Sequence, residues 1–380
     1  MVSSSKSIHP DRTIVITGIF SFFLLYTFGL SRSLSAVFDM MSIVVTLLIL
    51  PLFRYPENLK SKIRLVLLTI ATAVVSSLVN ISTFGWGGLM TILLLLLYFL
   101  LIGVVYINRQ LEHMILFILL LQMALLPFVD KTSYNPNTVA LVYLTIGIYI
   151  TLIFEPKLRV FQLLNLLLIV FGEYMIWITE SRTCFIAFLV YFILRYFSSF
   201  ILKNKYLLFV LVFILTAGSL VYVKIYVEMA QTGYSPELLE ILVLDSPGKG
   251  LFSGRESIWY ECLELFNRNP WFGTGSKINL QSFDSVNLHN SFLDFFVVYG
   301  FVVGSLIIYL IIKIIMDIHS YMYDPKIRKC TIAFFTFLIV AYSETNIAVM
   351  PFMSFLCLMM AYSRKRVLDA ISDHRIQLAK

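Results

Sequence analysis

Three basic side chains stand at positions where they could meet a phosphate group. Arg182 lies in a Ser-Arg-Thr triplet between two apolar runs, Arg255 follows a glycine in a polar stretch, and His289 comes just before another apolar run. A guanidinium group stays protonated and donates paired hydrogen bonds to phosphate oxygens. A histidine can accept a proton at neutral pH or donate a hydrogen bond to a phosphate. These residue types suit a pyrophosphate held at the level of lipid headgroups.

Each of these residues also has a plain structural interpretation. Arg182 can extend to lipid headgroups, or pair with Glu180 or Glu173 nearby in the sequence. His289 can be an interfacial residue whose hydrogen bonds are satisfied within the protein. Residue type alone therefore leaves both interpretations open.

Arg255 and Trp259 are four residues apart in a stretch with helical periodicity. On one helix face, a cation and an aromatic ring can meet a sugar phosphate and a pyranose ring. Such pairs also stabilise ordinary helices, so the spacing does not decide between the two roles. The apolar residues at helical spacing, which predict a packing face, are Ile258, Cys262, Leu265 and Phe266.

A turn is predicted after this helix, where residues 270–275 read Pro-Trp-Phe-Gly-Thr-Gly. The glycines allow the backbone to bend away from the helix end. The segment is not a nucleotide-binding P-loop, because that motif ends in Gly-Lys-Ser/Thr after a strand, and here the order is Gly275-Ser276-Lys277.

The elements that must position these residues are membrane helices. Of the 380 residues, 59% are hydrophobic and only 13% are charged, against roughly 25% charged in soluble domains. The apolar residues come in runs of about 17 to 25, the length of a membrane-spanning helix. This pattern excludes a soluble α/β enzyme, a secreted disulfide scaffold and an outer-membrane barrel. The four cysteines lack CxxC spacing and indicate no zinc site, and the net charge of +7 does not imply nucleic acid.

The predicted fold is an all-α polytopic membrane protein with about twelve transmembrane helices and one long external loop. Nine spans fall within residues 1–224, the loop covers 225–290, three spans fall within 291–363, and a tail covers 364–380. The predicted spans are 13–30, 34–53, 65–83, 86–107, 114–129, 138–154, 160–179, 183–202, 207–223, 291–315, 330–342 and 347–363.

The distribution of Lys and Arg predicts the orientation of these spans. With the N-terminus in the cytoplasm, most of the 29 Lys and Arg residues fall in inner segments, as the positive-inside rule requires. Both termini are then cytoplasmic, the first helix is retained, and the loop 225–290 faces outside. Glu173, Arg182, Asp294 and Glu344 then lie towards the outer face. Ionisable residues are costly in a bilayer, so their shared depth predicts an outer-face site.

The order of these motifs resembles that of the O-antigen polymerase and ligase superfamily of bacterial cell-envelope enzymes. The resemblance covers residues 161–315, and it rests on the combination of motifs more than on any one of them. In chain order the motifs are the Ser-Arg-Thr triplet at 181–183, Gly-Arg-Glu at 254–256 with Trp259, the turn at 270–275, His289-Asn290, and the Gly-containing helix at 300–304.

The resemblance implies a GT-C-like glycosyltransferase of the bacterial cytoplasmic membrane. It would use undecaprenyl-pyrophosphate-linked sugars without nucleotide sugar, ATP, cofactor or essential metal, and it would invert the anomeric carbon. Arg182 and Arg255 would neutralise the leaving pyrophosphate, and His289 would accept the acceptor's proton or orient it, with Glu256, Asp294 and Glu344 as rival bases. The candidates for substrate binding are Ser181, Glu256, Trp259, Asn290, Asp294 and Glu344.

Three functions fit this description. A polymerase, which we favour, transfers the growing chain to the next lipid-linked repeat unit. A ligase transfers it to lipid A core or to a protein. A flippase would move the lipid-linked oligosaccharide, but transporters place their ionisable residues near the midplane and keep external loops short. The expected partners are the lipid-linked donor and acceptor, the bilayer, a chain-length regulator and a flippase, and not nucleic acid.

Overall fold

The computed structural model of the protein describes residues 59–80, 136–153, 159–197, 199–232, 254–278 and 288–344, with isolated positions at 92, 95, 117, 120 and 280. The predicted spans at 13–30, 34–53 and 347–363 lie outside the described residues, as does the tail. Those at 86–107 and 114–129 do so apart from the isolated positions.

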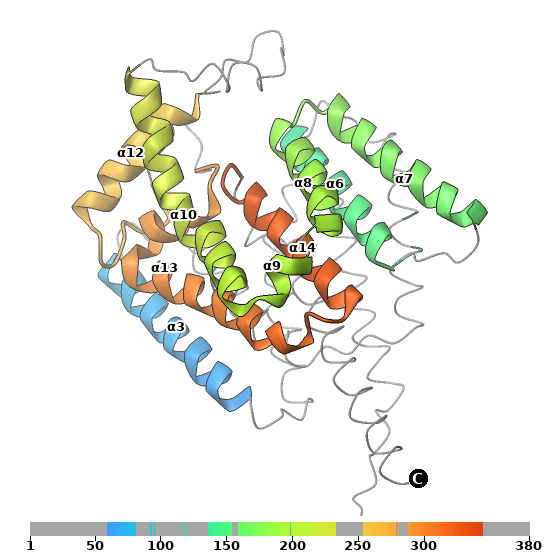
Figure 1. The fold of residues 1–380 in the computed structure, drawn as a ribbon. Helices are drawn as coiled ribbons and strands as arrows, with labels where there is room; N and C mark the ends of the chain where they lie inside the picture. Colours follow the sequence, from blue (N-terminus) through green and yellow to red (C-terminus); the bar gives the residue numbers. More distant parts are fainter. Residues whose placement is uncertain are drawn as a thin grey trace, which may run out of the picture.

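All regular secondary structure in the described residues is helical, as predicted (Figure 1). Seven predicted spans overlap these helices, and the number of spans stays a prediction. The helices are α3 (Leu59–Val79), α6 (Pro136–Ile153), α7 (Arg159–Ile178), α8 (Arg182–Phe197), α9 (Ser199–Lys203), α10 (Lys205–Thr232), α12 (Arg255–Arg268), α13 (Ser291–Asp317), a 3-10 turn (His319–Tyr321) and α14 (Pro325–Val340).

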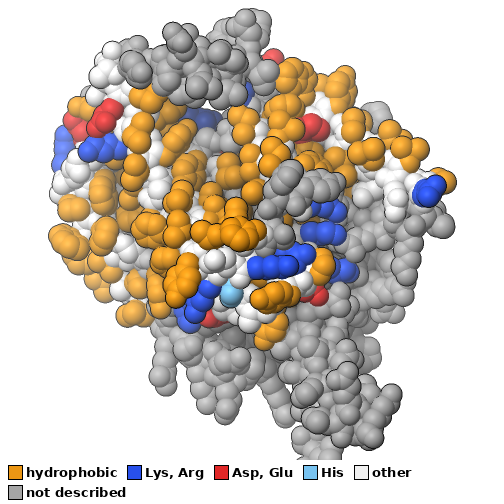
Figure 2. Space-filling model, viewed as in Figure 1, with side chains coloured by type: hydrophobic (Ala, Val, Ile, Leu, Met, Phe, Trp, Pro, Cys, Tyr) orange, Lys and Arg blue, Asp and Glu red, His pale blue; other side chains and the backbone are white. Residues whose placement is uncertain are grey.

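Two stretches of the described chain are long and apolar enough to cross a membrane. They are Lys205–Thr232 and Ser291–Tyr321. Large hydrophobic side chains also cover much of the surface (Figure 2), and on α7 they include Leu163, Leu167 and Trp177, each at least half exposed. An apolar surface of this extent is unfavourable in water but not in lipid. The helices are therefore those of a membrane protein.

Helix α13 lies at the centre of the part that contains the predicted site. It packs against α10, α3 and α12, while α14 packs against α8 and α10. Most of its side chains are buried, including Phe292, Phe295 and Tyr299. Helices α3, α10 and α12 are thereby held around one well-packed helix, and α14 and α8 are joined to it through α10.

Helix α13 is interrupted at Gly300, where φ is 82° and ψ is 176°. The loop 270–275 pairs with the interruption: Thr274 N–H donates to Val297 O at 2.8 Å, Gly275 N–H to Val298 O at 3.1 Å, and Phe301 N–H to Pro270 O at 2.7 Å. The loop therefore bonds backbone groups that the broken helix leaves open. The turn predicted after α12 fastens that helix to α13.

Glycine is required on both sides of this junction. A Cβ on Gly273 would lie 2.4 Å from Val298 O, and one on Gly300 would lie 2.3 Å from Trp271 O. Both glycines also have positive φ, which L-residues with side chains adopt at a cost. The two backbones can approach this closely only because neither residue has a side chain.

Helix α3 completes the junction from the other side. Ser76 Oγ donates to Phe272 O at 2.6 Å and lies 3.2 Å from Tyr299 O, and Asn80 Nδ2 donates to Phe272 O at 2.9 Å. Non-helical backbone within a membrane protein is stable only where other protein groups satisfy it. Ser76 and Asn80 do this for the loop and for the interruption in α13.

Several boundaries differ from the predictions: α3 begins at Leu59 and not at residue 65, and α14 begins at Pro325 and not at residue 330. Helix α10 continues to Thr232, nine residues beyond the predicted end of its span at 223, because tyrosines such as Tyr226 pack onto α12. Helix α12 begins at Arg255, and so includes the Arg255–Trp259 pair. Part of the long loop is thus helical and joined to the membrane helices.

Candidate active site

Arg255 is the first residue of α12. Gly254 precedes it with φ 78° and provides the turn into the helix, which ends where Asn269 N–H donates to Leu265 O. The inner face of α12 buries Ile258, Trp259 and Cys262, in agreement with the helical spacing of the apolar residues. This packing fixes the position from which the Arg255 side chain extends.

Trp259 anchors α12 and does not form the expected platform for a sugar. The residue is 0% exposed, and its ring lies 4.7 Å from that of Tyr226 and 5.8 Å from that of Tyr222, centroid to centroid. Its Nε1–H donates to Leu288 O at 2.8 Å. No face of the ring is open to a ligand, so Trp259 instead joins α10, α12 and the segment before α13.

Cys262 is one helical turn from Ile258 on the same buried face. Burial, followed by the nearby Asp294 carboxylate, raises the pKa of this thiol to about 12. The thiolate is the reactive form of cysteine. Cys262 is therefore a packing residue and not a nucleophile at neutral pH.

Asn290 caps the N-terminus of α13. Its Oδ1 accepts hydrogen bonds from Phe292 N–H at 3.1 Å and Leu293 N–H at 2.9 Å, and also from Ser219 Oγ of α10 at 3.1 Å. Its Nδ2 donates to Tyr342 O at 2.8 Å. These contacts use both ends of the buried amide, so Asn290 positions the helix, and its predicted contact with substrate stays a prediction.

Residues 342–344, after α14, are held against three helices. Ser291 Oγ of α13 donates to Glu344 O at 2.8 Å, and Ser343 Oγ donates to Thr183 Oγ1 of α8 at 2.8 Å. The Tyr342 hydroxyl donates to Ile214 O of α10. The segment therefore has a fixed place between α8, α10 and α13.

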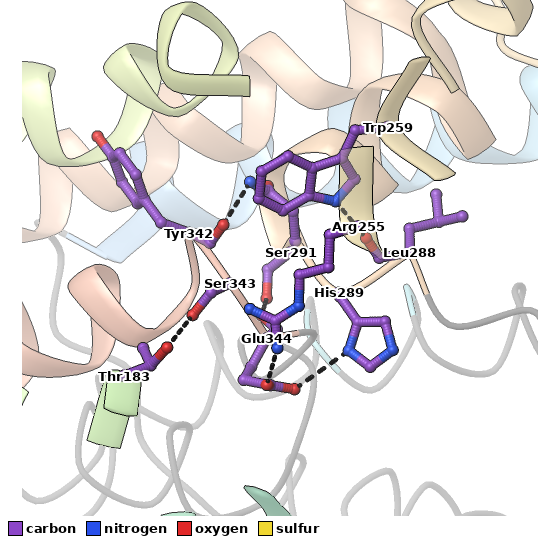
Figure 3. Close-up of polar contacts among 10 residues, drawn as sticks. Thr183, Arg255, Trp259, Leu288, His289, Ser291, Tyr342, Ser343 and Glu344 are labelled. Atoms are coloured by element: carbon purple, nitrogen blue, oxygen red, sulfur yellow. Dashed lines mark hydrogen bonds and ion pairs between the residues drawn. The ribbon is translucent and has the colours of Figure 1, made fainter. Parts of the chain in front are cut away.

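The Glu344 carboxylate brings together two of the predicted catalytic residues (Figure 3). Arg255 Nη2 donates to Glu344 Oε1 at 2.8 Å, and His289 Nδ1 lies 3.5 Å from Glu344 Oε2. The three side chains are 18%, 15% and 11% exposed for Arg255, His289 and Glu344 respectively. They form one partly buried polar group that stays accessible at its edge.

Arg182 lies next to a residue that contacts the segment 342–344. It is the first residue of α8, and the next residue, Thr183, contacts Ser343. Arg255 is likewise the first residue of α12. The N-termini of α8, α12 and α13 therefore converge on residues 342–344, and two of these helices begin with arginine.

The remaining predicted residues occupy less central places. Ser181 is buried directly before α8. Glu256 follows Arg255 and has a buried Oε2 with no hydrogen bond to a described residue. Asp294 lies in the first turn of α13. The structure does not bring these three into the Arg255–Glu344–His289 group by any hydrogen bond among the described residues. In that part of the chain, no set of three or more His, Cys, Asp or Glu side chains could hold a metal ion.

The polar residues that assemble the group were not identified from the sequence. They are Thr183, Ser219, Ser291 and Ser343. One signal was available, because asparagine directly before an apolar helix is a common N-cap, and it would have assigned Asn290 this structural role. The serine and threonine contacts join residues far apart in the chain and leave no local pattern.

Comparison with known proteins supports this region as a unit. Residues 164–308 match the family model Wzy_C, described as O-antigen ligase, and no curated protein matches the chain. The match includes Arg182, Arg255 and His289, and it ends before Glu344. The predicted resemblance is thus confirmed for residues 164–308, which are similar to the Wzy_C domain of the O-antigen ligase family; members of that family are polytopic membrane enzymes that transfer lipid-linked glycans.

Proposed function

We propose that the protein is a polysaccharide polymerase, which joins undecaprenyl-pyrophosphate-linked repeat units at the outer face of the bacterial cytoplasmic membrane. Its product would be O-antigen, capsule or exopolysaccharide, and both of its termini would be cytoplasmic. The observation that carries the proposal is the convergence of three helix N-termini, two of them led by Arg182 and Arg255, on residues 342–344.

This arrangement favours a ligand with several negative charges. A helix N-terminus carries a partial positive charge and usually attracts acidic residues. Arginine at the start of α8 and of α12 adds positive charge there, while Glu344 pairs with Arg255, and Glu256 and Asp294 lie in the first turns of α12 and α13. A pyrophosphate ester accepts hydrogen bonds from both guanidinium groups and from open backbone N–H groups. The lipid-linked donor brings such a group to the membrane surface.

The proposed reaction is a single displacement at the anomeric carbon of the donor sugar. A hydroxyl of the acceptor attacks this carbon and His289 accepts the hydroxyl proton. The bond from carbon to the pyrophosphate oxygen breaks, and that oxygen keeps the electron pair. Arg182 and Arg255 stabilise the developing negative charge in a partly buried site. Attack from the side opposite the leaving group inverts the anomeric carbon.

A polymerase requires two lipid-linked substrates, and two exposed apolar surfaces end near the site. Helix α7 ends at Ile178, four residues before Arg182. The exposed side of α10 includes Val221 and Ile225, next to the tyrosines that contact α12. Donor and acceptor lipids could approach along these surfaces. A ligase is the second candidate, because the matching family model bears that description.

The test is incubation of purified protein in detergent with a matching lipid-pyrophosphate-linked repeat unit as the sole substrate. A product ladder spaced by one repeat unit is expected for a polymerase. Transfer that requires lipid A core or a protein acceptor would replace the proposal by the ligase. Lipid that only changes leaflet in liposomes, without any new glycosidic bond, would exclude both enzymes.

A further inference from the structure

Glu344 uses its two carboxylate oxygens on two different residues. Oε1 accepts a hydrogen bond of 2.8 Å from Arg255, and Oε2 faces His289 Nδ1 at 3.5 Å (Figure 3). The second distance is longer than an ordinary hydrogen bond. Catalytic hydrogen bonds are often long before substrate binds and shorten in the reacting complex. The Glu344 carboxylate thus lies between the Arg255 guanidinium and the His289 imidazole.

The backbone at Glu344 is held firmly enough to orient its side chain. Its N–H donates to Val340 O at 2.9 Å and its O accepts from Ser291 Oγ at 2.8 Å. The preceding residue, Ser343, is bonded to Thr183 of α8. The carboxylate therefore leaves from a point fixed by α8, α13 and α14.

The backbone of His289 has an uncommon left-handed conformation. Its φ is 50°, in the left-handed region that a residue with a side chain rarely adopts. Both neighbours are fixed, because Leu288 O accepts from Trp259 Nε1 and Asn290 caps α13. Strain of this kind persists where the surroundings impose it, often at functional sites. In His289 it occurs beside the Glu344 carboxylate.

We propose that Glu344 is a positioning residue, which holds the proton of His289 on Nδ1 and so presents Nε2 as the base for the acceptor hydroxyl. This inference rests on the proposed glycosyl transfer. During the reaction the hydroxyl proton moves to Nε2, the acceptor oxygen bonds to the anomeric carbon, and the pyrophosphate leaves with the electron pair. The imidazolium that forms is stabilised by the carboxylate, as in other carboxylate–histidine pairs.

A direct role of Glu344 as base is disfavoured by the same contacts. Both oxygens already face protein partners, and the side chain is only 11% exposed. An acceptor hydroxyl would have to displace Arg255 or His289 to reach it. Arg255, in contrast, has further N–H groups available for a phosphate while Nη2 stays on Glu344.

The test is Glu344→Gln in the full-length protein. The amide oxygen can still accept the hydrogen bond from Arg255, but the amide N–H then faces Nδ1 and favours the proton on Nε2. We expect kcat to fall about 10²-fold with little change in KM, within the about 10²- to 10⁴-fold that a general base contributes. Glu344→Asp should recover part of the loss. Glu264→Gln, in an exposed pair with Arg268 on α12, is the matched control and should keep full activity.

A second measurement separates this role from a structural one and from the proposed function. Nitrogen NMR of ¹⁵N-histidine-labelled protein in detergent, with His289 assigned by His289→Gln, reports which nitrogen carries the proton. We expect Nδ1–H in the wild type and Nε2–H in Glu344→Gln. The same tautomer in both proteins would overturn the inference, as would an undiminished effect of Glu344→Gln in a His289→Ala background. If the wild type transfers no glycan to any acceptor while the tautomer still switches, the proposed function fails and the contact between Glu344 and His289 stands.

Discussion

Helix α13 is joined to other parts of the chain at two places, to residues 342–344 at its N-terminus and to the loop 270–275 near Gly300, and the two junctions are built differently. At its N-terminus, the contacts are made by side chains: Asn290 and Ser291 bind the backbone of residues 342–344, and Glu344 binds Arg255 and His289. At its interruption near Gly300, the contacts to the loop 270–275 are made by backbone groups, with glycine on both sides.

The two junctions therefore differ in role: the first holds side chains that could take part in a reaction, and the second stabilises the fold. The N-terminal junction contains ionisable groups that stay partly accessible, so a ligand can compete for them. At the junction near Gly300, the contacts between α13 and the loop 270–275 are hydrogen bonds between backbone groups. We therefore expect changes at the first junction to reduce catalysis and changes at the second to reduce stability. The following variants test this separation, from the largest expected effect to the smallest.

Arg255→Ala should have the largest effect on activity. The variant loses a cation proposed to stabilise the leaving pyrophosphate, and removing one such donor costs about 10²- to 10³-fold in kcat. Glycan transfer is measured with the purified lipid-linked substrate, and melting in detergent checks folding. The control is Arg268→Ala at the exposed end of the same helix, which should transfer glycan normally. Equal activity of the two variants would remove Arg255 from the site.

Gly300→Ala should have the largest effect on stability. The new Cβ would clash with Trp271 O, and the backbone has a conformation that is nearly exclusive to glycine, so we expect a loss of more than about 2 kcal/mol. Gly254→Ala is the control for stability, because it has positive φ but nothing within 4 Å of the new Cβ. It should lose only about 1 kcal/mol. A Gly300→Ala protein that melts no earlier than Gly254→Ala would show that the close approach is dispensable.

Asn290→Ala should reduce both glycan transfer and stability. Asn290 belongs to the junction at the N-terminus of α13, where it caps the helix and positions its neighbours. Loss of a cap costs about 1 kcal/mol, and the partner of Tyr342 O is lost as well. Asn204→Ala removes a comparable exposed cap from α10. Both variants should melt earlier, and only Asn290→Ala should also slow glycan transfer. If Asn204→Ala slows transfer equally, the effect of Asn290 is general destabilisation.

Ser76→Ala should have the smallest effect of the four. It removes the hydroxyl that bonds Phe272 O and Tyr299 O, at a cost of about 1 kcal/mol. The neighbouring Ser77 bonds only Ala73 O, within its own helix, so Ser77→Ala should change melting by no more than a few tenths of a kcal/mol. A larger loss in Ser77→Ala than in Ser76→Ala would contradict the role of α3 at the junction.

The helices of the described chain could be predicted because membrane spans are encoded locally. A run of apolar residues of sufficient length forms a helix wherever it lies, so α6, α7 and α13 start within two residues of the predicted spans. The extent of α10 was underestimated, since its last residues are stabilised by aromatic contacts to α12. Apolarity alone does not contain that information.

The site could be predicted in part. Arg255 and His289 were selected because their residue types suit phosphate binding and proton transfer, and Glu344 because ionisable residues are rare in a bilayer. Their contacts agree with a shared location, and their roles stay proposals. The role of Trp259 was not predictable, because helical spacing places it on the same face as Arg255 but does not reveal that Tyr222 and Tyr226 cover it. The contact between residues 255 and 344 spans 89 positions, and the sequence contains no local sign of it.

The position of Glu344 in the chain has a consequence for biosynthesis. The ribosome releases Arg182, Arg255 and His289 well before Glu344, which reaches Arg255 across 89 residues while Ser343 reaches Thr183 across 160. Contacts of such separation form late. Until Glu344 has been synthesised, Arg255 therefore lacks this carboxylate partner. A nascent chain that stops before Glu344 would hold the proposed catalytic groups yet lack the piece that orders them, so competence for glycan transfer would arise only near the end of synthesis.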